Sequence, residues 1–549
     1  MMNLMEKKIT AEVARWGVVA DYERIPSEIV KRLRYQILGM LGSFFGSLRT
    51  DMGKRFFDHL VSIARPGEIP VPATDKKVSL EDALRIYTSM SMLLDYDDYL
   101  FMGHTGHSAV WTSLLAGLKF QKSSREILTG IAIGNEAGGR LGGAVLLGPH
   151  NGQMWSFIHG VNSALIYGRF SGLDFEQILN AVSLYLYQPH YPLYPGFMNS
   201  DAKILTAARP VIEGIHAVEI ARGGFGGYER IIEGKRGLLE NFSIVPFDFL
   251  ISDFGRSWVT YSLAVKIYPG CAYIDTTMDA LNEIFREKEI DPDKIREVHI
   301  RANLLTFQMN RIAEDYFDPA FLSPININFN LKINTALFLL NGRLTPELLS
   351  VGYLSDNRRK ILNLAERIKI EHWWPHTFDT IYAAFNSMNW EKLIGTTGHL
   401  DLKNLKNQLE KYHGSSGVEI SMREFLHLRK VLPPEKKKFL HRIILKSLKN
   451  RVVKGEEGDF SLKDINFEKF SMPFGVDVEI VMENGSTFGK SVSIPEGVSY
   501  KEGFEEKVKM KFIENALPFI GRERSEEVIE IVENFEEKPA YLLFEKLTG

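Results

Sequence analysis

The sequence has a single cysteine, Cys271, among its 549 residues. One thiol cannot form a disulfide within the chain, and it cannot ligate an iron–sulfur cluster, which takes several thiolates. The sequence also lacks an apolar run of about 18 residues, the length at which a helix can cross a bilayer. Residues 1–8 are charged and precede no apolar segment of the kind found in leader peptides. These absences predict a cytoplasmic protein without a membrane anchor.

An excess of charge of either sign is missing as well. The chain has 66 basic and 69 acidic residues, so no net field favours nucleic acid or an anionic membrane. Its length exceeds what one hydrophobic core supports and predicts about two to four domains. We therefore expect small molecules or other protein subunits as partners, and neither nucleic acid nor a membrane.

Hydrophobic periodicity changes along the chain. Residues 8–265 show mostly helical spacing, short alternating runs appear after residue 266, and helical spacing returns from about residue 500. The dipeptide Asn484-Gly485 lies between two alternating runs and predicts a hairpin turn. Three runs predict strands: residues 298–302, 476–482 and 491–494.

Glycine recurs at every fourth position of one predicted helix, at Gly130, Gly134, Gly138 and Gly142. Each glycine in a helix costs about 1 kcal/mol relative to alanine, so a stripe of them predicts that another segment packs very closely there. A phosphate-binding loop is the alternative, but no strand signal precedes these glycines.

The densest group of ionisable side chains lies in residues 95–107, which contain three carboxylates and two imidazoles. These groups transfer protons most readily near neutral pH, which makes Asp95, His104 and His107 candidates for acid–base catalysis. One alternative is a polar loop that caps a helix. The other is a metal site, which we do not expect because no third ligand follows in an obvious motif.

Several segments together resemble one known family. They are Asp-Tyr-Asp-Asp from Asp95, Gly-Asn-Glu-Ala-Gly-Gly-Arg-Leu-Gly from Gly134, Gly-Pro-His ending at His150, Lys203 with the following Ala-Arg-Gly-Gly-Phe-Gly-Gly from Ala221, and Lys-Ile-Tyr-Pro-Gly-Cys from Lys266. With the segment from Phe329 to Gly342, they resemble the MmgE/PrpD family, which includes 2-methylcitrate dehydratase and cis-aconitate decarboxylase.

The resemblance implies a mainly α fold with an α/β part. On that template, residues 1–265 and 500–549 form a large helical domain, and residues 266–499 form an α/β lid domain. The site would lie between the two domains, and residues 375–465 would be a helical insertion within the lid. The resemblance also implies a homodimer formed through the helical domain.

The activity that the resemblance implies is elimination of water or CO2 from a small polycarboxylate, or its epimerisation, without a metal or an organic cofactor. Removing a proton α to a carboxylate places negative charge on that carboxylate, so the site must supply a base, a cation and an acid for any leaving group. Lys203 and Lys266 are the candidate cations. The candidate proton carriers are His150 and one of His104 and His107, of which we prefer His104.

Further residues are expected to position these groups. Asp95 corresponds to the family aspartate that orients an imidazole, and Ser200 or Asp201 is a plausible N-cap that would place Lys203 in the first turn of a helix running to Arg222. The helix dipole there would lower the pKa of the lysine. Three further residues are candidates for substrate binding: Tyr99, Ser200 and Cys271.

The chain departs from the decarboxylase-like members of the family at four positions. Tyr99 replaces a threonine, and Thr105 or His104 stands where those members have their loop histidine. Cys271 replaces a histidine and Ile333 a tyrosine, which removes two proton donors from the lid side. The leading hypothesis is therefore a cofactor-independent dehydratase of the 2-methylcitrate type. The alternatives are an epimerase of a dicarboxylate, a decarboxylase of the cis-aconitate type, and a non-catalytic binding protein that uses the lid insertion as its contact surface.

Overall fold

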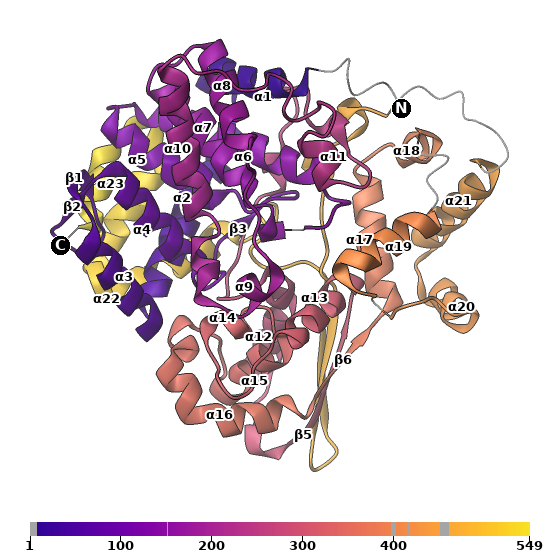
Figure 1. Ribbon diagram of the computed structural model, residues 1–549. Helices are drawn as coiled ribbons and strands as arrows, with labels where there is room; N and C mark the ends of the chain where they lie inside the picture. The colour runs from indigo at the N-terminus through magenta and orange to yellow at the C-terminus, as the bar shows by residue number, and fades with distance from the viewer. Residues whose placement is uncertain (1–7, 151, 397–401, 416, 451–459, 549) are drawn as a thin grey trace.

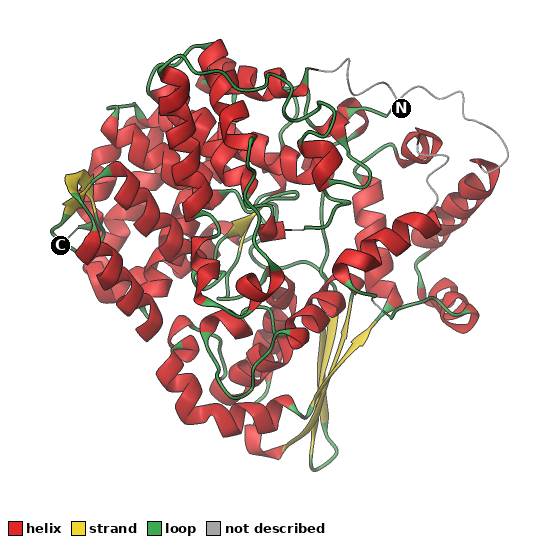
Figure 2. Ribbon diagram, in the orientation of Figure 1, coloured by secondary structure: helices red, strands yellow, loops and turns green. Residues whose placement is uncertain are grey.

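A computed structural model describes residues 8–150, 152–396, 402–415, 417–450 and 460–548. Helices dominate the fold, and most strand residues belong to one four-stranded sheet (Figure 2). The prediction of a mainly α fold with an α/β part is confirmed. The charged N-terminus, on which the prediction of a leaderless chain depends, lies mostly outside the described residues. Across the described ranges, no helix has both the length and the apolar character needed to cross a bilayer.

The helical part combines both ends of the chain. Helix α2, near the start of the chain, packs along α22, near its end, and both lie in the helical part on the left of Figure 1. Helix α6 packs between α5 and α7, and α10 packs on α7 and α8. The helices are α1 (Ile9–Val19), α2 (Ser27–Leu48), α3 (Asp51–Ile63), α4 (Leu80–Met92), α5 (Gly106–Lys119), α6 (Ser124–Ala144), α7 (Phe157–Phe170), α8 (Phe175–Leu186), α9 (Tyr194–Met198), α10 (Ala208–Arg222), α11 (Leu238–Phe242), α22 (Phe504–Glu533) and α23 (Ala540–Leu547).

Helix α6 carries the glycine stripe. A capping box between Ser123 and Glu126 satisfies the free N–H groups at its start. A Cβ added to Gly134 would lie 2.7 Å from the Cβ of Ala109 in α5, and one added to Gly142 would lie 2.1 Å from the carbonyl oxygen of Met102. The predicted close packing against this helix is confirmed, because neither position has room for a larger side chain.

The same helix anchors the loop that leads into the site. Glu136 and Arg140 form a fully buried ion pair one turn apart, with Arg140 Nη2 3.1 Å from Glu136 Oε2. Glu136 also accepts hydrogen bonds from the backbone N–H groups of Val259 and Thr260, both at 3.0 Å. The pair is compensated by these hydrogen bonds, as a buried ion pair must be, and it fixes the segment that precedes the second strand of the site.

The lid contains the four-stranded sheet, in the order β6-β5-β7-β8. β5 and β6 are parallel, and the other two pairs are antiparallel. The predicted hairpin at Asn484-Gly485 is confirmed, with Gly485 at φ +83° between β7 and β8. The elements are β5 (Ile295–Ala302), β6 (Ile368–His372), β7 (Val476–Met482), β8 (Thr487–Val492), α12 (Asp275–Glu287), α13 (Leu304–Asp315), α14 (Pro324–Ile327), α15 (Leu331–Asn341) and α16 (Val351–Ala365).

One predicted strand has different bounds in the structure, and one strand of the sheet was not predicted. The last strand runs over residues 487–492, whereas residues 491–494 were expected to form it; it begins earlier because it pairs with β7 along its whole length. Strand β6 was not predicted at all. Its side chains alternate in burial, but only Ile368 is fully buried, because the strand lies at the edge of the sheet.

The segment predicted as a helical insertion is mostly helical where it is described. Its helices lie beside the lid on the right of Figure 1 and share a small apolar core that includes Phe378, Trp390 and Phe439. Residues 397–401, 416 and 451–459 of this segment lie outside the described residues. The helices are α17 (Trp374–Asn386), α18 (Trp390–Thr396), α19 (Leu402–His413), α20 (Met422–Val431) and α21 (Pro434–Asn450).

Two large apolar cores underlie the helical part and the lid. One is built from α1–α8, α10, α22 and α23, and the other from the lid sheet with α12, α15 and α16. Leu93, Leu94 and Tyr96 come from the helical part of the sequence but pack into the lid core. The acidic segment around Asp95 therefore lies where the two cores meet. The domain boundaries near residues 265 and 500 stay a prediction that agrees with this distribution.

Candidate active site

A short strand pair brings the acidic segment to the segment of Lys266. Strand β3 (Asp98–Tyr99) pairs antiparallel with β4 (Ala264–Val265), and the backbone N–H of Lys266 donates to the carbonyl oxygen of Asp97 at 3.0 Å. Two segments more than 160 residues apart in sequence are thus held side by side. This pairing places the Lys266 side chain over the carboxylates.

Two lysines and two aspartates meet in the interior of the molecule. Lys266 Nζ lies 2.6 Å from Asp97 Oδ1 and 3.3 Å from Asp95 Oδ1, and Lys203 Nζ lies 3.5 Å from the same oxygen of Asp95. The side chains of all four residues are at most 1% exposed. We call these four residues, together with His104, the charged centre.

The backbone at Asp95 is strained. Its φ is +56°, a left-handed conformation that few residues other than glycine adopt, although aspartate tolerates it better than most. Gln153 Nε2 donates to Asp95 Oδ1, and Lys266 Nζ donates to the Asp95 carbonyl oxygen at 2.8 Å. Among the described residues, the second carboxylate oxygen of Asp95 has no hydrogen-bond partner. Strain and an unpaired buried oxygen at one residue are typical of functional sites.

Asp97, and not Asp95, contacts the imidazoles. Its Oδ2 lies 2.8 Å from His104 Nδ1 and 3.0 Å from His107 Nε2. Asp95 was expected to make this contact, because nothing in the motif distinguishes Asp97 from its neighbours. The structure corrects this expectation, since β3 begins one residue later and the turn before it directs Asp97 toward both histidines.

The two histidines differ in their freedom to exchange protons. His107 is fully buried and both ring nitrogens are engaged, with Nδ1 2.8 Å from Ser91 Oγ. The side chain of His104 is 15% exposed, and among the described residues its Nε2 has no hydrogen-bond partner. The geometry therefore supports the preference for His104 as the proton carrier and gives His107 a positioning role.

Lys203 lies in a different local structure from the one expected. Ser200 does cap a turn, but its hydroxyl accepts from the N–H of Ala202 at the start of a short 3-10 helix, Asp201–Leu205. Helix α10 begins separately at Ala208. A continuous helix would place Pro210 in its interior, where proline lacks a donor and clashes with the preceding turn, so the chain restarts with Pro210 in the first turn. The expected effect of the α10 dipole on Lys203 is therefore wrong.

Lys203 is buried in an apolar, aromatic environment, and this burial, instead of a helix dipole, lowers its pKa. Lys203 Nζ lies 4.5 Å from the ring centroid of Phe329 and 5.3 Å from that of Phe197. With the Asn328 amide oriented to satisfy both its ends, its oxygen accepts from Lys203 Nζ at 3.0 Å. Apart from Asp95, the ammonium group thus has mainly an amide and ring faces for solvation.

The two lysines have opposite pKa shifts. Burial lowers the pKa of Lys203, and the opposing attraction of Asp95 does not make up for it. Burial acts on Lys266 in the same direction, but Asp95 and then Asp97 outweigh it and raise the pKa of Lys266 above its usual value. Lys266 is therefore a fixed cation, and Lys203 is the lysine that loses its proton more easily.

The carboxyl groups respond to the same charges. Burial alone would raise the pKa of Asp97, but Lys266 and then His104 and His107 outweigh it and hold the pKa well below its usual range. For Asp95, burial is outweighed by Lys203 and then Lys266, and the pKa is lowered as well. Both carboxylates are ionised at neutral pH.

The three expected substrate-binding residues lie in different surroundings. Cys271 is buried beside Met154, Phe197 and Phe329, and burial raises the pKa of its thiol to about 12, so it is an unreactive thiol near neutral pH. Tyr99 has its ring 6.3 Å from that of His104, centroid to centroid. The Ser200 hydroxyl bonds within its own turn, to Gly196 O and Ala202 N.

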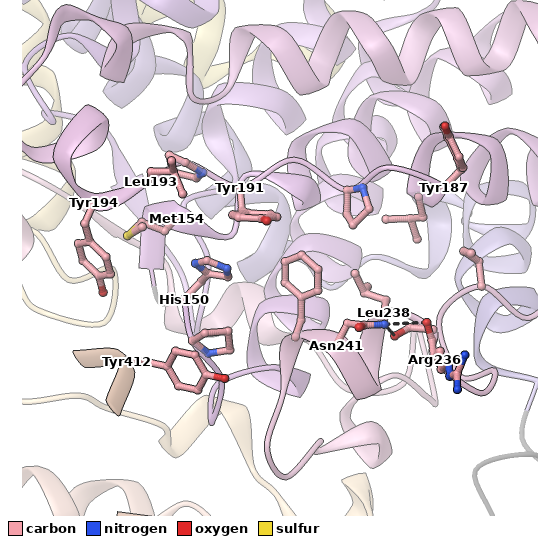
Figure 3. A pocket seen from close by; sticks show the side chains of 17 residues that line it. His150, Met154, Tyr187, Tyr191, Leu193, Tyr194, Arg236, Leu238, Asn241 and Tyr412 are labelled. Carbon is pink, nitrogen blue, oxygen red and sulfur yellow. Dashed lines mark hydrogen bonds between the residues drawn. The ribbon is translucent and has the colours of Figure 1, made fainter. Parts of the chain in front are cut away.

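His150 is not in contact with the charged centre. It lines a cavity of about 600 Å³ together with Tyr191, Phe242 and other aromatic residues (Figure 3). Burial and then the neighbouring His413 lower the pKa of His150 to about 4. The next short 3-10 helix, Gly152–Met154, joins the two places, because Gln153 contacts Asp95 and Met154 lines the cavity.

Sequence reasoning missed the amides of the site. Gln153 and Asn328 contact the charged centre, but amide side chains are common and no spacing marks them as functional. His159, nine residues after His150, is buried with its ring centroid 5.9 Å from that of His107. Across the described residues, no group of three or more His, Cys, Asp or Glu side chains is arranged to hold a metal ion.

The fold and site define a mainly α protein with a charged centre buried where its helical part meets an α/β part. Residues 11–249 match the model of the MmgE/PrpD N-terminal domain, so the resemblance to this family is confirmed over that segment. A curated relative from Aspergillus terreus (strain NIH 2624 / FGSC A1156), named cis-aconitate decarboxylase, is 22% identical over 320 residues, which cover 54% of this chain and 62% of that protein.

A second relative from Aspergillus terreus has the same name. It is 22% identical over 324 residues, which cover 54% of this chain and 65% of that protein. The match to this chain thus spans less than two thirds of the length of either relative.

Proposed function

We propose that the protein is a cofactor-independent lyase that removes a proton α to a carboxylate of a small di- or tricarboxylate. One observation carries this proposal: the Nζ atoms of Lys203 and Lys266 lie within 3.5 Å of one oxygen of Asp95, in a fully buried site. Two lysines held there at such close range are costly unless their charges are used, and perturbed groups of this kind cluster at catalytic sites.

The roles follow from the surroundings of each group. Lys266 remains a cation and would stabilise the negative charge that develops on the substrate carboxylate when the proton is removed. Lys203, with its lowered pKa, is the proposed base. His104, held through Nδ1 by Asp97, would present Nε2 as the acid for a leaving hydroxyl group.

Access to the centre requires movement. Lys203, Lys266 and Asp95 are buried, so a substrate can reach them only if the lid and the helical part separate, as in enzymes that close over their substrates. The helical part and the lid each bury most of their apolar side chains in a core of their own, with Leu93, Leu94 and Tyr96 reaching from the helical part into the lid core. Such a division allows relative motion of the two parts.

Loss of water, as in a 2-methylcitrate dehydratase, is the simplest form of the proposal. Decarboxylation is the second candidate, and the printed name of both curated relatives, cis-aconitate decarboxylase, favours it. Cys271 and Ile333 weigh against it, because the resemblance places a histidine and a tyrosine at these positions. Ile333 has no ionisable proton, and the raised pKa of Cys271 makes its thiol a weaker acid than the histidine it replaces.

The experiment is proton exchange in D2O over citrate-like, tartrate-like and amino dicarboxylate compounds, followed by NMR. Loss of water supports the dehydratase, release of CO2 supports the decarboxylase, and exchange without elimination supports an epimerase. Lys203→Met is expected to lower any of these rates by about 10²-fold or more, whereas Lys54→Met, at an exposed position, leaves them unchanged. Silence of the unmodified protein with every compound contradicts the proposal and favours a non-catalytic binding protein.

A homodimer and a cytoplasmic location belong to the same proposal. The family resemblance supports a homodimer. The single cysteine fits a cytoplasmic location, because that compartment is reducing. Light scattering on the purified chain tests the dimer, and a monomer at micromolar concentration would contradict it.

A further inference from the structure

The cavity that contains His150 is separated from the charged centre by one short turn. Gln153 donates to Asp95 on one side of this turn, and Met154 lines the cavity on the other. Met154 also packs in one apolar cluster with Phe197 and Phe329, the two rings that face Lys203. A molecule whose carboxylate reached the charged centre could therefore extend its remainder into this cavity.

The walls of the cavity are aromatic and carry little charge. Tyr187, Tyr191, Tyr194, Tyr412 and Phe242 supply most of the ring surface. No carboxylate is found among the described residues that line it, and its one guanidinium, that of Arg236, is exposed and lies at the far end from His150 (Figure 3). A volume of about 600 Å³ with mostly apolar walls and a few polar groups is typical of a small-molecule site.

His150 adds no charge at neutral pH. Its ring packs on Tyr191 with centroids 4.6 Å apart and on Phe242 at 5.6 Å. The Nδ1 atom is buried and has no hydrogen-bond partner among the described residues. With its pKa lowered to about 4, the imidazole is neutral and can offer a hydrogen bond to a ligand, but not an ion pair.

The lid insertion completes the cavity. Helix α19 places Tyr412 in the wall of the cavity. The next residue, His413, forms hydrogen bonds through both of its ring nitrogens. His413 Nε2 lies 2.8 Å from the carbonyl oxygen of Gly148 and so donates to it, which leaves Nδ1 to accept from the hydroxyl of Tyr194 at 3.2 Å. This tautomer docks the insertion on the segment that carries His150.

We propose that this cavity binds an apolar substituent of the carboxylate substrate, and that helix α19 makes the protein selective for substrates that carry one. The proposal rests on the proposed lyase function and specifies its substrate class as alkyl- or aryl-substituted di- or tricarboxylates. An unsubstituted tricarboxylate fits the cavity poorly, because it would place several negative charges against aromatic walls that offer one cation at the rim.

The test measures binding of succinate, n-butylsuccinate and n-octylsuccinate to the full chain by isothermal titration calorimetry. Burial of each methylene group is expected to tighten binding about fourfold, so the dissociation constant falls steeply along the series. Tyr412→Ala, which removes a cavity wall at a side chain that is 47% exposed, should weaken n-octylsuccinate about tenfold and leave succinate unchanged.

The matched control is Tyr541→Ala, at an equally exposed tyrosine on α23 that does not line the cavity. It should bind all three compounds as the unmodified protein does. A dissociation constant independent of chain length, or equal effects of the two tyrosine variants, would overturn the proposal.

Proton exchange measured on the same samples separates this proposal from the function on which it rests. Exchange of succinate-type compounds without any preference for chain length leaves the lyase standing and removes the cavity proposal. Binding that depends on chain length, with no exchange of any carboxylate, contradicts the lyase and identifies an alkylcarboxylate-binding protein.

Discussion

At the scale of single residues, Asp97 connects the lysine of the site to its two histidines. Its two oxygens contact Lys266, His104 and His107 at 2.6, 2.8 and 3.0 Å. Asp97→Asn is expected to remove activity and to lower the free energy of unfolding by about 3–5 kcal/mol, because Lys266 loses the nearer of its two carboxylate partners in a buried site. Urea unfolding at pH 7 measures the loss.

The pH dependence of that contribution has a definite sign. The pKa of Asp97 in the folded protein lies below its ordinary value of 3.8. Its stabilisation is therefore complete above pH 3.8 and is lost as the pH falls through the folded-state pKa. Asp98→Asn is the control, since burial and then Asp97 raise the pKa of Asp98. An equal loss of stability in both variants would show that Asp97 has no special place.

The two histidines provide a second prediction. His104→Gln should lower the rate of elimination by about 10²–10⁴-fold and change stability little, because this side chain, the proposed acid for the leaving group, is partly exposed and bonds through one nitrogen. His107→Gln should instead lower stability, because its ring is buried and bonded at both nitrogens. Elimination rates and unfolding curves of both variants distinguish the roles; the reverse pattern would assign the proton carrier to His107.

Sequence reasoning works well for charged residues and poorly for their partners. Lys203, Lys266 and Asp95 were all predicted for the site, and the structure brings their side chains together. His150 was predicted with them, but it faces the cavity on the other side of the turn. A shift of the backbone turn by one residue decides which carboxylate of the acidic segment faces a histidine. The pattern of residue types carries no information about the position of that turn.

At the scale of elements, the glycine stripe of α6 offers a direct test of packing. Replacing glycine by alanine within a helix normally stabilises it by about 1 kcal/mol. At Gly142 the new Cβ would meet the backbone oxygen of Met102 at 2.1 Å, and backbone cannot yield cheaply. Gly142→Ala is therefore expected to destabilise the protein by about 1–3 kcal/mol, measured by thermal or urea unfolding.

Gly196→Ala serves as the control for that prediction. A Cβ there meets nothing closer than the Ser200 hydroxyl at 3.9 Å, and Gly196 does not have a positive φ. Gly196 lies within helix α9, so alanine there should leave stability unchanged or raise it by up to about 1 kcal/mol. A stabilised Gly142→Ala would mean that α6 and the loop before α5 are not packed as closely as the structure shows.

Elements were predictable where local signals agree. The turn at Asn484-Gly485 and the stripe of α6 depend on residues close in sequence, and both are found as expected. The break between the turn of Lys203 and α10 follows from Pro210, a signal that was present in the sequence but outweighed by the capping pattern at Ser200. Strand β6 depends on its partner β5, some 70 residues away, and no local pattern reports such a pairing.

At the scale of the whole molecule, Lys511 ties the C-terminal helix to the acidic segment. It is buried in α22, and its Nζ donates to the carbonyl oxygen of Tyr96 at 2.5 Å and lies 3.9 Å from the centroid of the Tyr96 ring. Burial lowers the pKa of Lys511 to about 7; Asp97 and Asp98 oppose this shift and Lys266 adds to it. Asp275 of the lid also attracts it, and its own pKa is raised well above the usual range, first by burial.

The lysine makes overall stability depend on pH near neutrality. Between about pH 7 and 10.5, Lys511 is neutral in the folded protein but charged in the unfolded chain, so the unfolded state binds more protons. Stability should therefore rise with pH across this window, at most by about 1.4 kcal/mol per pH unit from this group. Lys511→Met is expected to flatten that slope in urea unfolding between pH 7 and 9 and to leave stability at pH 7 equal or higher.

Lys507→Met, one turn earlier on the same helix, isolates the effect of burial. Lys507 is partly exposed and faces Glu496 at 3.6 Å, so its removal should lower stability slightly and leave the slope with pH unchanged. Lys203, whose pKa is also lowered, contributes to the slope in both variants and does not affect the comparison. If the slope is the same in Lys511→Met as in Lys507→Met, then Lys511 remains charged in the folded protein and Asp275 must carry the compensating negative charge.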